Sequence, residues 1–273
     1  MKVIAFSPAH ITGFFQIFID ENEEMTGSTG AGISISLGSY VEVKKSKKFL
    51  ISKKAKIVRE TIKMIGRNFE IRIKNELPIS QGFGISGASA LAAALAACHI
   101  YNIPYEKAIE YAHIAEVRNK TGLGDVIASF YGGMEARIIP GLEGKIKKWN
   151  VNEKILIGII GKKIETRDII SNEKIVDRIN EIGGKCLKEF LKKPSFYNFL
   201  YLSKIFSEEI SLNEKILKIL KKLNKIDLAS ICMIGNSIFS RWSKKMKKAM
   251  LKYGKVYEAY IDNYGARIIA SIS

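Results

Sequence analysis

The sequence predicts an α+β protein made of two layered halves. Alternating strand patterns and amphipathic helical patterns follow one another irregularly along the 273 residues, which favours this class. The chain also changes character near residue 150, where short strands and turns give way to long lysine-rich helices. With 47% hydrophobic residues, the chain has enough apolar side chains for its cores. We therefore predict one domain over residues 1–150 and a second over residues 151–273.

The first half is expected to open with a short strand at residues 2–6, followed by an inward-packing loop at 7–15 that contains Pro8 and Gly13. A second glycine-rich stretch, at residues 27–32, predicts a turn. The elements expected after this turn are a strand at 33–37, an exposed lysine-rich ribbon at 41–52, a helix at 55–66, a strand at 69–74, helices at 88–100, 104–118 and 126–131, and strands at 134–139 and 145–149. The second half is expected to contain a strand at 155–160, helices between 171 and 224, a strand at 229–234, a helix at 243–253 and two terminal strands.

A net charge of +17 is the most unusual feature of the composition, and such a charge is typical of nucleic-acid-binding proteins. The lysines, however, recur at helical spacing, as in residues 217–223 (LKILKKL), and therefore predict solvated helix faces. No basic stretch carries the interleaved aromatic residues on which bases stack. We therefore expect no nucleic-acid partner, while the positive field would attract anionic substrates such as ATP.

Nothing in the sequence predicts a membrane or secreted protein. No apolar run approaches the about 18–20 residues that a bilayer requires, and the N-terminal residues turn polar too soon for a signal peptide. Cys98, Cys186 and Cys232 are far apart and surrounded by apolar residues, which predicts reduced core residues and neither disulfides nor a zinc site. We expect a cytoplasmic protein without a membrane partner.

A glycine-rich segment at residues 77–91, LPISQGFGISGASAL, separates the strand at 69–74 from an apolar helix of small residues. Glycines let a backbone turn tightly and approach a ligand without a Cβ in the way. A helix N-terminus offers free N–H groups and a partial positive charge, which suit a phosphate. The segment therefore predicts a phosphate-binding loop, although a glycine-rich turn before a buried helix would leave the same pattern.

Two well-known phosphate-binding loops do not fit this segment. Residues 82–87 match G-x-G-x-x-G, the dinucleotide fingerprint, but a loop separates them from the preceding strand and a second helix follows. The P-loop requires Gly-Lys-Ser/Thr, whereas Gly87 is followed by Ala88 and Ser89. The pattern that remains, P-x-x-x-G-[LF]-G-x-S-[GA]-A, resembles the phosphate loop of the GHMP kinases, the superfamily of galactokinase, homoserine kinase and mevalonate kinase.

Glu116 and Asp125 are the carboxylates that best fit such a kinase. Glu116 is expected near the end of the helix at 104–118, and Asp125 follows a glycine-rich turn. Phosphoryl transfer needs a metal ligand and a group that orients the acceptor hydroxyl, and Mg²⁺ prefers few protein oxygens beside phosphates and waters. Glu116 and the Ser86 hydroxyl would hold the metal, and Asp125 would face the acceptor. Alternatively, Glu116 is a solvated helix residue and Asp125 is the N-cap of the next helix.

The order of these features strengthens the resemblance. The loop, the helical Glu116, the segment 121–126 (TGLGDV) and Gly132-Gly133 are similar to the order of motifs in GHMP kinases. The resemblance implies an ATP-dependent kinase in which Ser86 and Glu116 hold Mg²⁺ and Asp125 acts as the base. The residues that it implies for cradling ATP are Pro78, Gly82, Phe83, Gly84, Ile85, Ser86, Gly87, Ala88 and Ser89.

Two departures from the superfamily pattern point to one branch of it. His10 stands where a lysine is usual, and residues 233–239 lack the expected glycines. Together with the segments 7–15, 27–32 and 121–125, these residues resemble the archaeal pantoate kinases of coenzyme A synthesis, over nearly the whole chain. The resemblance implies a homodimer whose N-terminal domain contains a left-handed β-α-β unit and whose C-terminal domain is ferredoxin-like.

The acceptor pantoate carries a carboxylate, two hydroxyls and a gem-dimethyl carbon. A carboxylate requires a cationic donor, and the arginine fork suits it best, so Arg137 is the first candidate. Ile11 and Phe14 would supply an apolar wall for the methyl groups. Further candidates for contact with the substrate are His10, His113 and Thr166. Each of these three also has the alternative of an ordinary structural role.

Two rival functions stay open at this point. Another GHMP kinase, acting on mevalonate, homoserine or shikimate, would differ only in its acceptor pocket. A basic RNA-associated or regulatory protein could also have kept the fold without the chemistry. The intact Ser86, Glu116 and Asp125 argue against that loss of activity.

Overall fold

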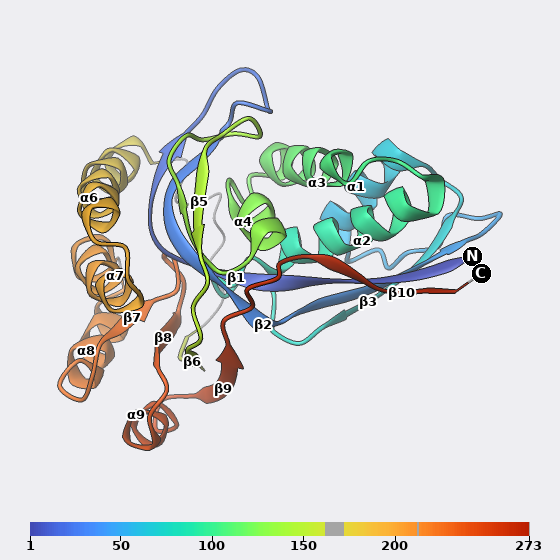
Figure 1. Ribbon diagram of the computed structural model, residues 1–273. Coiled ribbons are helices and arrows are strands. Elements are labelled where there is room, and N and C mark those ends of the chain that lie inside the picture. Colours follow the sequence, from blue (N-terminus) through green and yellow to red (C-terminus); the bar gives the residue numbers. More distant parts are fainter. Residues whose placement is uncertain (162–171, 212, 273) are drawn as a thin grey trace.

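The computed structural model describes residues 1–161, 172–211 and 213–272. In Figure 1, helices α1 to α3 lie at one end of the molecule and helices α6 to α9 at the other, with long strands running between them. These strands belong to two sheets. The first has the order β10-β1-β2-β4-β5, with β3 paired to β2, and the second has the order β7-β8-β6-β9.

Two long antiparallel strands, β1 (Lys2–Phe18) and β2 (Gly27–Lys45), form the centre of the first sheet. The predictions of a loop at 7–15 and a turn at 27–32 are therefore wrong. The pairing accommodates the loop-like residues through register shifts between Pro8 and Ala9 and between Thr12 and Phe14, which are typical sites for proline and glycine in a sheet.

The exposed ribbon expected at 41–52 is confirmed only in part. Lys44, Lys45, Lys47 and Lys48 are exposed, but strand β2 ends at Lys45. The Val41 and Val43 side chains are fully buried. They are covered because β2 lies between β1 and β3 (Phe69–Asn75), with the helices of this half packed on one face of the sheet.

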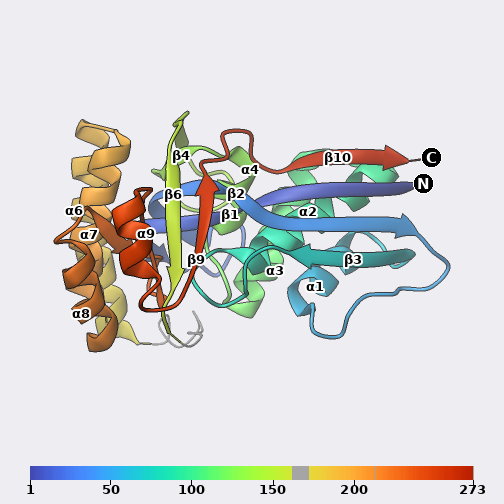
Figure 2. The ribbon, with the colours of Figure 1, turned by 90° about the horizontal axis from the view of Figure 1, so that it is seen from below.

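The remaining strands of the first sheet come from distant parts of the chain. They are β4 (Met134–Arg137), β5 (Ile146–Trp149) and β10 (Arg267–Ile272). Strand β10 pairs antiparallel with β1, so the end of the chain returns to the first sheet. Figure 2 shows β10, β1, β2 and β3 side by side, with the two termini adjacent.

The helices of this half are α1 (Lys56–Ile65), α2 (Ile85–Tyr101), α3 (Tyr105–Asn119) and α4 (Asp125–Tyr131). Helix α2 is the central one, because its alanines are buried on every side and contact the sheet, α1 and α3. Small side chains allow this close approach. Helix α2 begins three residues earlier than predicted, which places the last part of the glycine-rich segment in its first turn.

The second sheet is antiparallel and consists of β6 (Lys154–Ile159), β7 (Ala229–Ile231), β8 (Ser237–Arg241) and β9 (Lys255–Tyr260). One strand was predicted at 229–234. Instead, β7 ends at Ile231 and a second strand, β8, follows after a short turn. The helices beside this sheet are α6 (Glu173–Lys192), α7 (Phe196–Ile210), α8 (Glu214–Leu223) and α9 (Lys244–Met250). Within the described residues, no helix combines the length and apolarity that crossing a membrane requires.

One apolar cluster joins the two sheets. The Phe14 ring of β1 lies 5.9 Å from Phe190 and 6.1 Å from Phe199, and Phe199 lies 5.9 Å from Phe239 of β8, each measured between ring centroids. The three cysteines are free and buried, as predicted. The division of the chain at residue 150 stays a prediction, since both halves contribute to this cluster.

Candidate active site

The glycine-rich segment forms a loop between β3 and the N-terminus of α2. Gly82 and Gly84 adopt φ angles of +84° and +58°, the left-handed region that glycine occupies without strain. The loop is tied to β1 because the His10 backbone N–H donates to the Phe83 carbonyl at 3.0 Å. No side chain caps the α2 N-terminus, so its first N–H groups are available to an anion.

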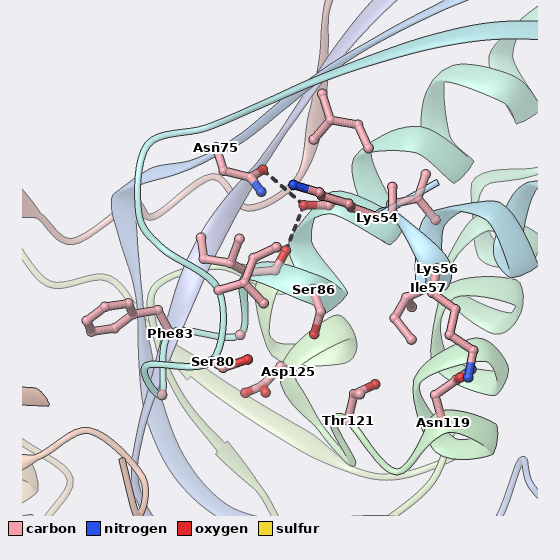
Figure 3. Close-up of a pocket in the computed structure, with 18 of the residues that line it drawn as sticks. Lys54, Lys56, Ile57, Asn75, Ser80, Phe83, Ser86, Asn119, Thr121 and Asp125 are labelled. Atoms are coloured by element: carbon pink, nitrogen blue, oxygen red, sulfur yellow. Dashed lines mark hydrogen bonds between the residues drawn. The ribbon is translucent and has the colours of Figure 1, made fainter. Parts of the chain in front are cut away.

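A pocket of about 500 Å³ opens over this loop, a volume that suits a nucleotide. Its walls come from the loop, from the start of α1, from the turn after α3 and from the turn between β7 and β8. Figure 3 shows Ser80, Ser86, Thr121 and Asp125 turned toward one space in this pocket. The loop and helix residues that line it are Ile79, Ser80, Gly82, Phe83, Gly84, Ile85, Ser86 and Ser89.

Replacing Gly82 by alanine is expected to weaken nucleotide binding. A Cβ at this position would lie 2.4 Å from the Cys232 carbonyl oxygen, and the positive φ would add strain, so the loop must move. We expect the Kd for ATP to rise about tenfold and the free energy of unfolding to fall by about 1–3 kcal/mol. Calorimetric titration and urea denaturation measure the two effects.

The matched control for this variant is Gly158→Ala. A Cβ at Gly158 would meet only the flexible Met250 Cε atom within 3.0 Å. This residue lies in β6, away from the loop. Equal nucleotide affinity of the Gly82→Ala variant and the parent would contradict the importance of the loop conformation.

Glu116 is a buried acid and not a solvated helix residue. Its side chain is almost fully buried, and its Oε1 atom accepts a hydrogen bond from Thr121 Oγ1 at 2.9 Å. Its Oε2 atom has no hydrogen-bond partner of standard geometry among the described residues. Burial and the charge of Asp125 raise the pKa of Glu116 to about 7, although the nearby hydroxyls of Ser86 and Thr121 oppose the rise. An orphaned buried carboxylate oxygen beside a hydroxyl is suited to a hard cation.

Two glycines bring Glu116 close to the phosphate loop. A Cβ at Gly122 would lie 2.2 Å from Glu116 Oε2, and a Cβ at Gly87 would lie 3.4 Å from the same atom. The absence of side chains at both positions lets the end of α3 approach the first turn of α2.

Asp125 is the first residue of α4 and does not cap it. The N-cap position belongs to Gly124, and no side-chain capping hydrogen bond is made there. Instead, Asp125 Oδ1 lies 2.9 Å from His10 Nδ1. The carboxylate thus lies between the phosphate loop and strand β1, with 12% of its side chain exposed to solvent.

A row of four alternating charges extends from Asp125 into the sheet. His10 Nε2 lies 3.0 Å from Glu135 Oε1, and Arg137 Nη1 donates to the same Glu135 oxygen. Burial opposes the charged form of His10, but the hydrogen bonds to Asp125 and Glu135 outweigh it and raise the pKa of His10 above its usual value. The His10 ring therefore bridges the carboxylates of Asp125 and Glu135.

A second, smaller cavity of about 30 Å³ lies on the other side of Asp125. Gly124 and Ser28 line it, and a Cβ at Gly124 would lie 2.7 Å from Arg137 Nε. This Nε atom is buried and has no hydrogen-bond partner among the described residues. The complete lining is Thr12, Phe15, Ile17, Ser28, Gly122, Leu123, Gly124, Asp125, Met233 and Ile234. Asp125 thus contributes to the walls of both cavities.

Several candidates lie outside these cavities. Pro78, Gly87 and Ala88 flank the pocket without lining it. Ser89 does line the pocket, but its hydroxyl is also held within a buried cluster, 2.8 Å from the Ile85 carbonyl and 3.0 Å from Asn75 Oδ1.

The other acceptor candidates differ in their surroundings. His113 is buried on α3, with Nε2 2.9 Å from the Thr26 carbonyl, and burial lowers its pKa. Thr166 lies outside the described residues. Ile11 and Phe14, the residues expected to form the apolar wall, are fully buried in the core and line neither cavity, whereas Phe15 and Ile17 line the small cavity.

Comparison with known proteins identifies the class of this site. Residues 50–133 match the family model of the GHMP kinases N terminal domain. A crystal structure of homoserine kinase from Cytophaga hutchinsonii has the same fold, with a TM-score of 0.68 at 17% identity over 98% of this chain and 97% of that chain. The chain therefore has the fold of the GHMP kinases and matches their N-terminal domain over residues 50–133.

Two closer relatives narrow the class. A pantoate kinase from Methanocaldococcus jannaschii is 42% identical over 246 residues, which cover 86% of this chain and 90% of the relative. A solved phosphotransferase related to the CoA biosynthesis pathway has a TM-score of 0.87 and 27% identity, with 98% of both chains covered. The chain therefore belongs to the pantoate kinase family, whose members are phosphotransferases with an alcohol group as acceptor and ATP as donor.

Proposed function

We propose that this protein transfers the γ-phosphoryl group of ATP to the primary hydroxyl of pantoate, giving 4-phosphopantoate for coenzyme A synthesis. The observation that carries the proposal is the position of Asp125 in the walls of both cavities, directly after Gly124, which packs against the unpaired Nε of Arg137. A nucleotide in the large pocket and a small hydroxy acid in the other would meet at this carboxylate. Family membership supports the same acceptor.

The large pocket offers the phosphates a set of fixed dipoles. The left-handed glycines expose the loop backbone, and the α2 N-terminus adds partial positive charge. Phosphoryl transfer requires little covalent chemistry from the protein, so positioning and charge stabilisation supply most of the catalysis.

Glu116 and Ser86 fit a Mg²⁺ ion. The fit rests on the orphaned Oε2 atom of Glu116, which faces the first turn of α2 where Ser86 stands. When bound, Mg²⁺ would neutralise charge on the phosphate oxygens. One carboxylate and one hydroxyl leave room for the phosphates and waters that this ion prefers.

Asp125 orients the acceptor hydroxyl and receives its proton. His10 occupies one carboxylate oxygen, Oδ1. The other oxygen, Oδ2, lies 3.3 Å from where a Cβ of Gly84 would be and so faces the phosphate loop. A hydroxyl that donates to Oδ2 would therefore point its lone pair toward the γ-phosphate.

Arg137 receives the acceptor carboxylate. Arg137 is 3% exposed and uses Nη1 for Glu135, which leaves Nε, behind Gly124 of the cavity wall, for a second anion. Phe15 and Ile17 supply apolar surface for the methyl groups of pantoate. At about 30 Å³ the cavity has room for about one water molecule, so pantoate enters only when the walls move.

Replacing Arg137 by lysine is expected to raise the KM for pantoate about 10–100-fold, because lysine keeps the charge but loses the fork that binds a carboxylate. The KM for ATP should change by less than about threefold, since Arg137 does not line the large pocket. Steady-state kinetics with each substrate varied in turn measures both constants. An unchanged KM for pantoate would remove Arg137 from the acceptor site.

The proposed function is tested by ADP release from Mg-ATP with pantoate, mevalonate, homoserine and shikimate offered separately. Release with pantoate alone is expected. Release with a different acceptor would keep the kinase and overturn the acceptor assignment, whereas release with none would overturn the proposed activity.

We also propose that the enzyme acts as a homodimer in the cytoplasm. The free, buried cysteines and the use of ATP support a reducing compartment. The homodimer rests on the family resemblance and is tested by light scattering, for which a monomeric mass would be the contrary result.

A further inference from the structure

Glu135 is a buried carboxylate that has no part in the reaction scheme above. Its side chain is fully buried on β4, between the buried apolar residues Met134 and Ala136. A buried carboxylate is costly unless cations or hydrogen-bond donors compensate it. Here Oε1 alone accepts from both His10 and Arg137, and Oε2 has no partner among the described residues. Both donors belong to the acceptor side of the site.

On one side, Glu135 fixes the orientation of His10. The His10 ring crosses from β1 over Gly32 of β2, where a Cβ would lie 2.2 Å from Nε2, to reach Glu135 on β4. A neutral imidazole carries one proton and can donate to only one carboxylate, so donation to both Asp125 and Glu135 requires the imidazolium. A third side chain, the Thr12 hydroxyl, lies 3.4 Å from Nδ1 of the ring.

On the other side, Glu135 fixes the plane of the Arg137 guanidinium. A guanidinium is planar and rigid, so anchoring Nη1 determines where the remaining N–H groups point. In the described structure, the buried Nε lies next to Gly124, the residue before Asp125. Without Glu135, the arginine would be free to turn toward Asp125, the nearest other carboxylate of the row.

We propose that Glu135 is a positioning residue that couples recognition of the acceptor carboxylate at Arg137 to the orientation of Asp125 through His10. This inference rests on the proposed function, because it takes the acceptor to be a hydroxy acid. Asp125, His10, Glu135 and Arg137 alternate in sign and sum to zero charge. The acceptor carboxylate is then the one additional negative charge, and it binds at Arg137, the last member of the hydrogen-bonded row that begins at Asp125.

The coupling predicts a particular pattern in the kinetics of variants with pantoate as acceptor. Glu135→Gln should lower kcat about 10–100-fold and also raise the KM for pantoate, because both ends of the row lose their anchor. His10→Gln should lower kcat with little change in that KM. In the double variant, kcat should fall less than about twofold below the lower single variant, because Glu135 acts on kcat through His10. Independent, multiplicative losses of kcat would overturn the proposal.

A control separates this role from a structural one. Asp262 is another buried carboxylate, 3.0 Å from Arg267 at the start of β10 and outside both cavities. Asp262→Asn is expected to lower the melting temperature while leaving kcat and the KM for pantoate at parent values. If Glu135→Gln behaves like this control, Glu135 is only structural and the proposal is wrong.

A second readout does not depend on turnover. The chain has 3 histidines, so nitrogen NMR of labelled histidine can resolve His10, with His10→Gln identifying its signals. At about neutral pH, both His10 ring nitrogens should be protonated in the parent, and one should lose its proton in Glu135→Gln. If both His10 nitrogens stay protonated in that variant, Glu135 does not determine the protonation of His10, and the proposal is wrong. Absence of pantoate turnover in the parent would instead refute the proposed function, while this spectrum would still test the link.

Discussion

Replacing Asp125 by asparagine is expected to lower kcat by about 10²–10⁴-fold while the KM for ATP changes by less than about threefold. Asparagine keeps an oxygen that can accept from His10 Nδ1. Its NH₂ group, however, replaces Oδ2, the oxygen that faces the phosphate loop. An amide NH₂ donates and cannot receive a proton, so the acceptor hydroxyl loses both its orientation and its base.

Steady-state kinetics with pantoate and Mg-ATP measures the effect, and nucleotide titration establishes that the large pocket is intact. Because asparagine has nearly the same size and shape as aspartate, the affinity for ATP should stay close to the parent value. Turnover within about threefold of the parent would exclude Asp125 as the base. The row of charges would then have no catalytic group to orient.

Local patterns predicted the helices of this fold well, and they predicted the two longest strands poorly. Helix α1 and the helices after the phosphate loop lie close to their expected positions, because apolar residues at helical spacing form the packed face. In β1 and β2, proline and glycines break the pattern that marks a strand. These residues serve close packing across the sheet, as at Gly30, where a Cβ would lie 2.2 Å from the Phe14 carbonyl.

The location of the candidate site was predictable where it depends on a contiguous motif. The phosphate loop and the pair Glu116 and Asp125 are recognisable from spacing, and the structure brings both carboxylates to the loop. Glu135 was not recognised, because its role depends on pairing between β2 and β4 and on a histidine 125 positions away. One local signal was present: Glu135 and Arg137 alternate with apolar residues in a strand that is otherwise expected to be buried.

Glu116 should make the nucleotide-free protein less stable as the pH rises. Folding raises the pKa of this acid from 4.5 to about 7, so the folded state binds the proton more tightly than the unfolded state. The contribution is therefore fully favourable below about pH 4.5, is lost as the pH rises, and is absent above about pH 7. The shift corresponds to about 3 kcal/mol in the free energy of unfolding. Glu116→Gln removes the titration and should be more stable than the parent at about pH 8, with the difference vanishing near pH 4.5.

Mg-ATP should reverse the order of stability of the parent and the Glu116→Gln variant at about pH 8. This comparison is therefore the strongest test of the metal site. The ionised carboxylate that destabilises the empty pocket becomes a ligand when the cation binds, so the parent should gain more stability from Mg-ATP than the variant does. The variant should also lose about 10²–10³-fold in kcat, because glutamine is a neutral and weaker ligand for Mg²⁺. Urea denaturation at the two pH values, with EDTA and then with Mg-ATP, measures both effects. Equal stabilisation of parent and variant by Mg-ATP would mean that Glu116 is a buried structural acid and that the metal is held elsewhere.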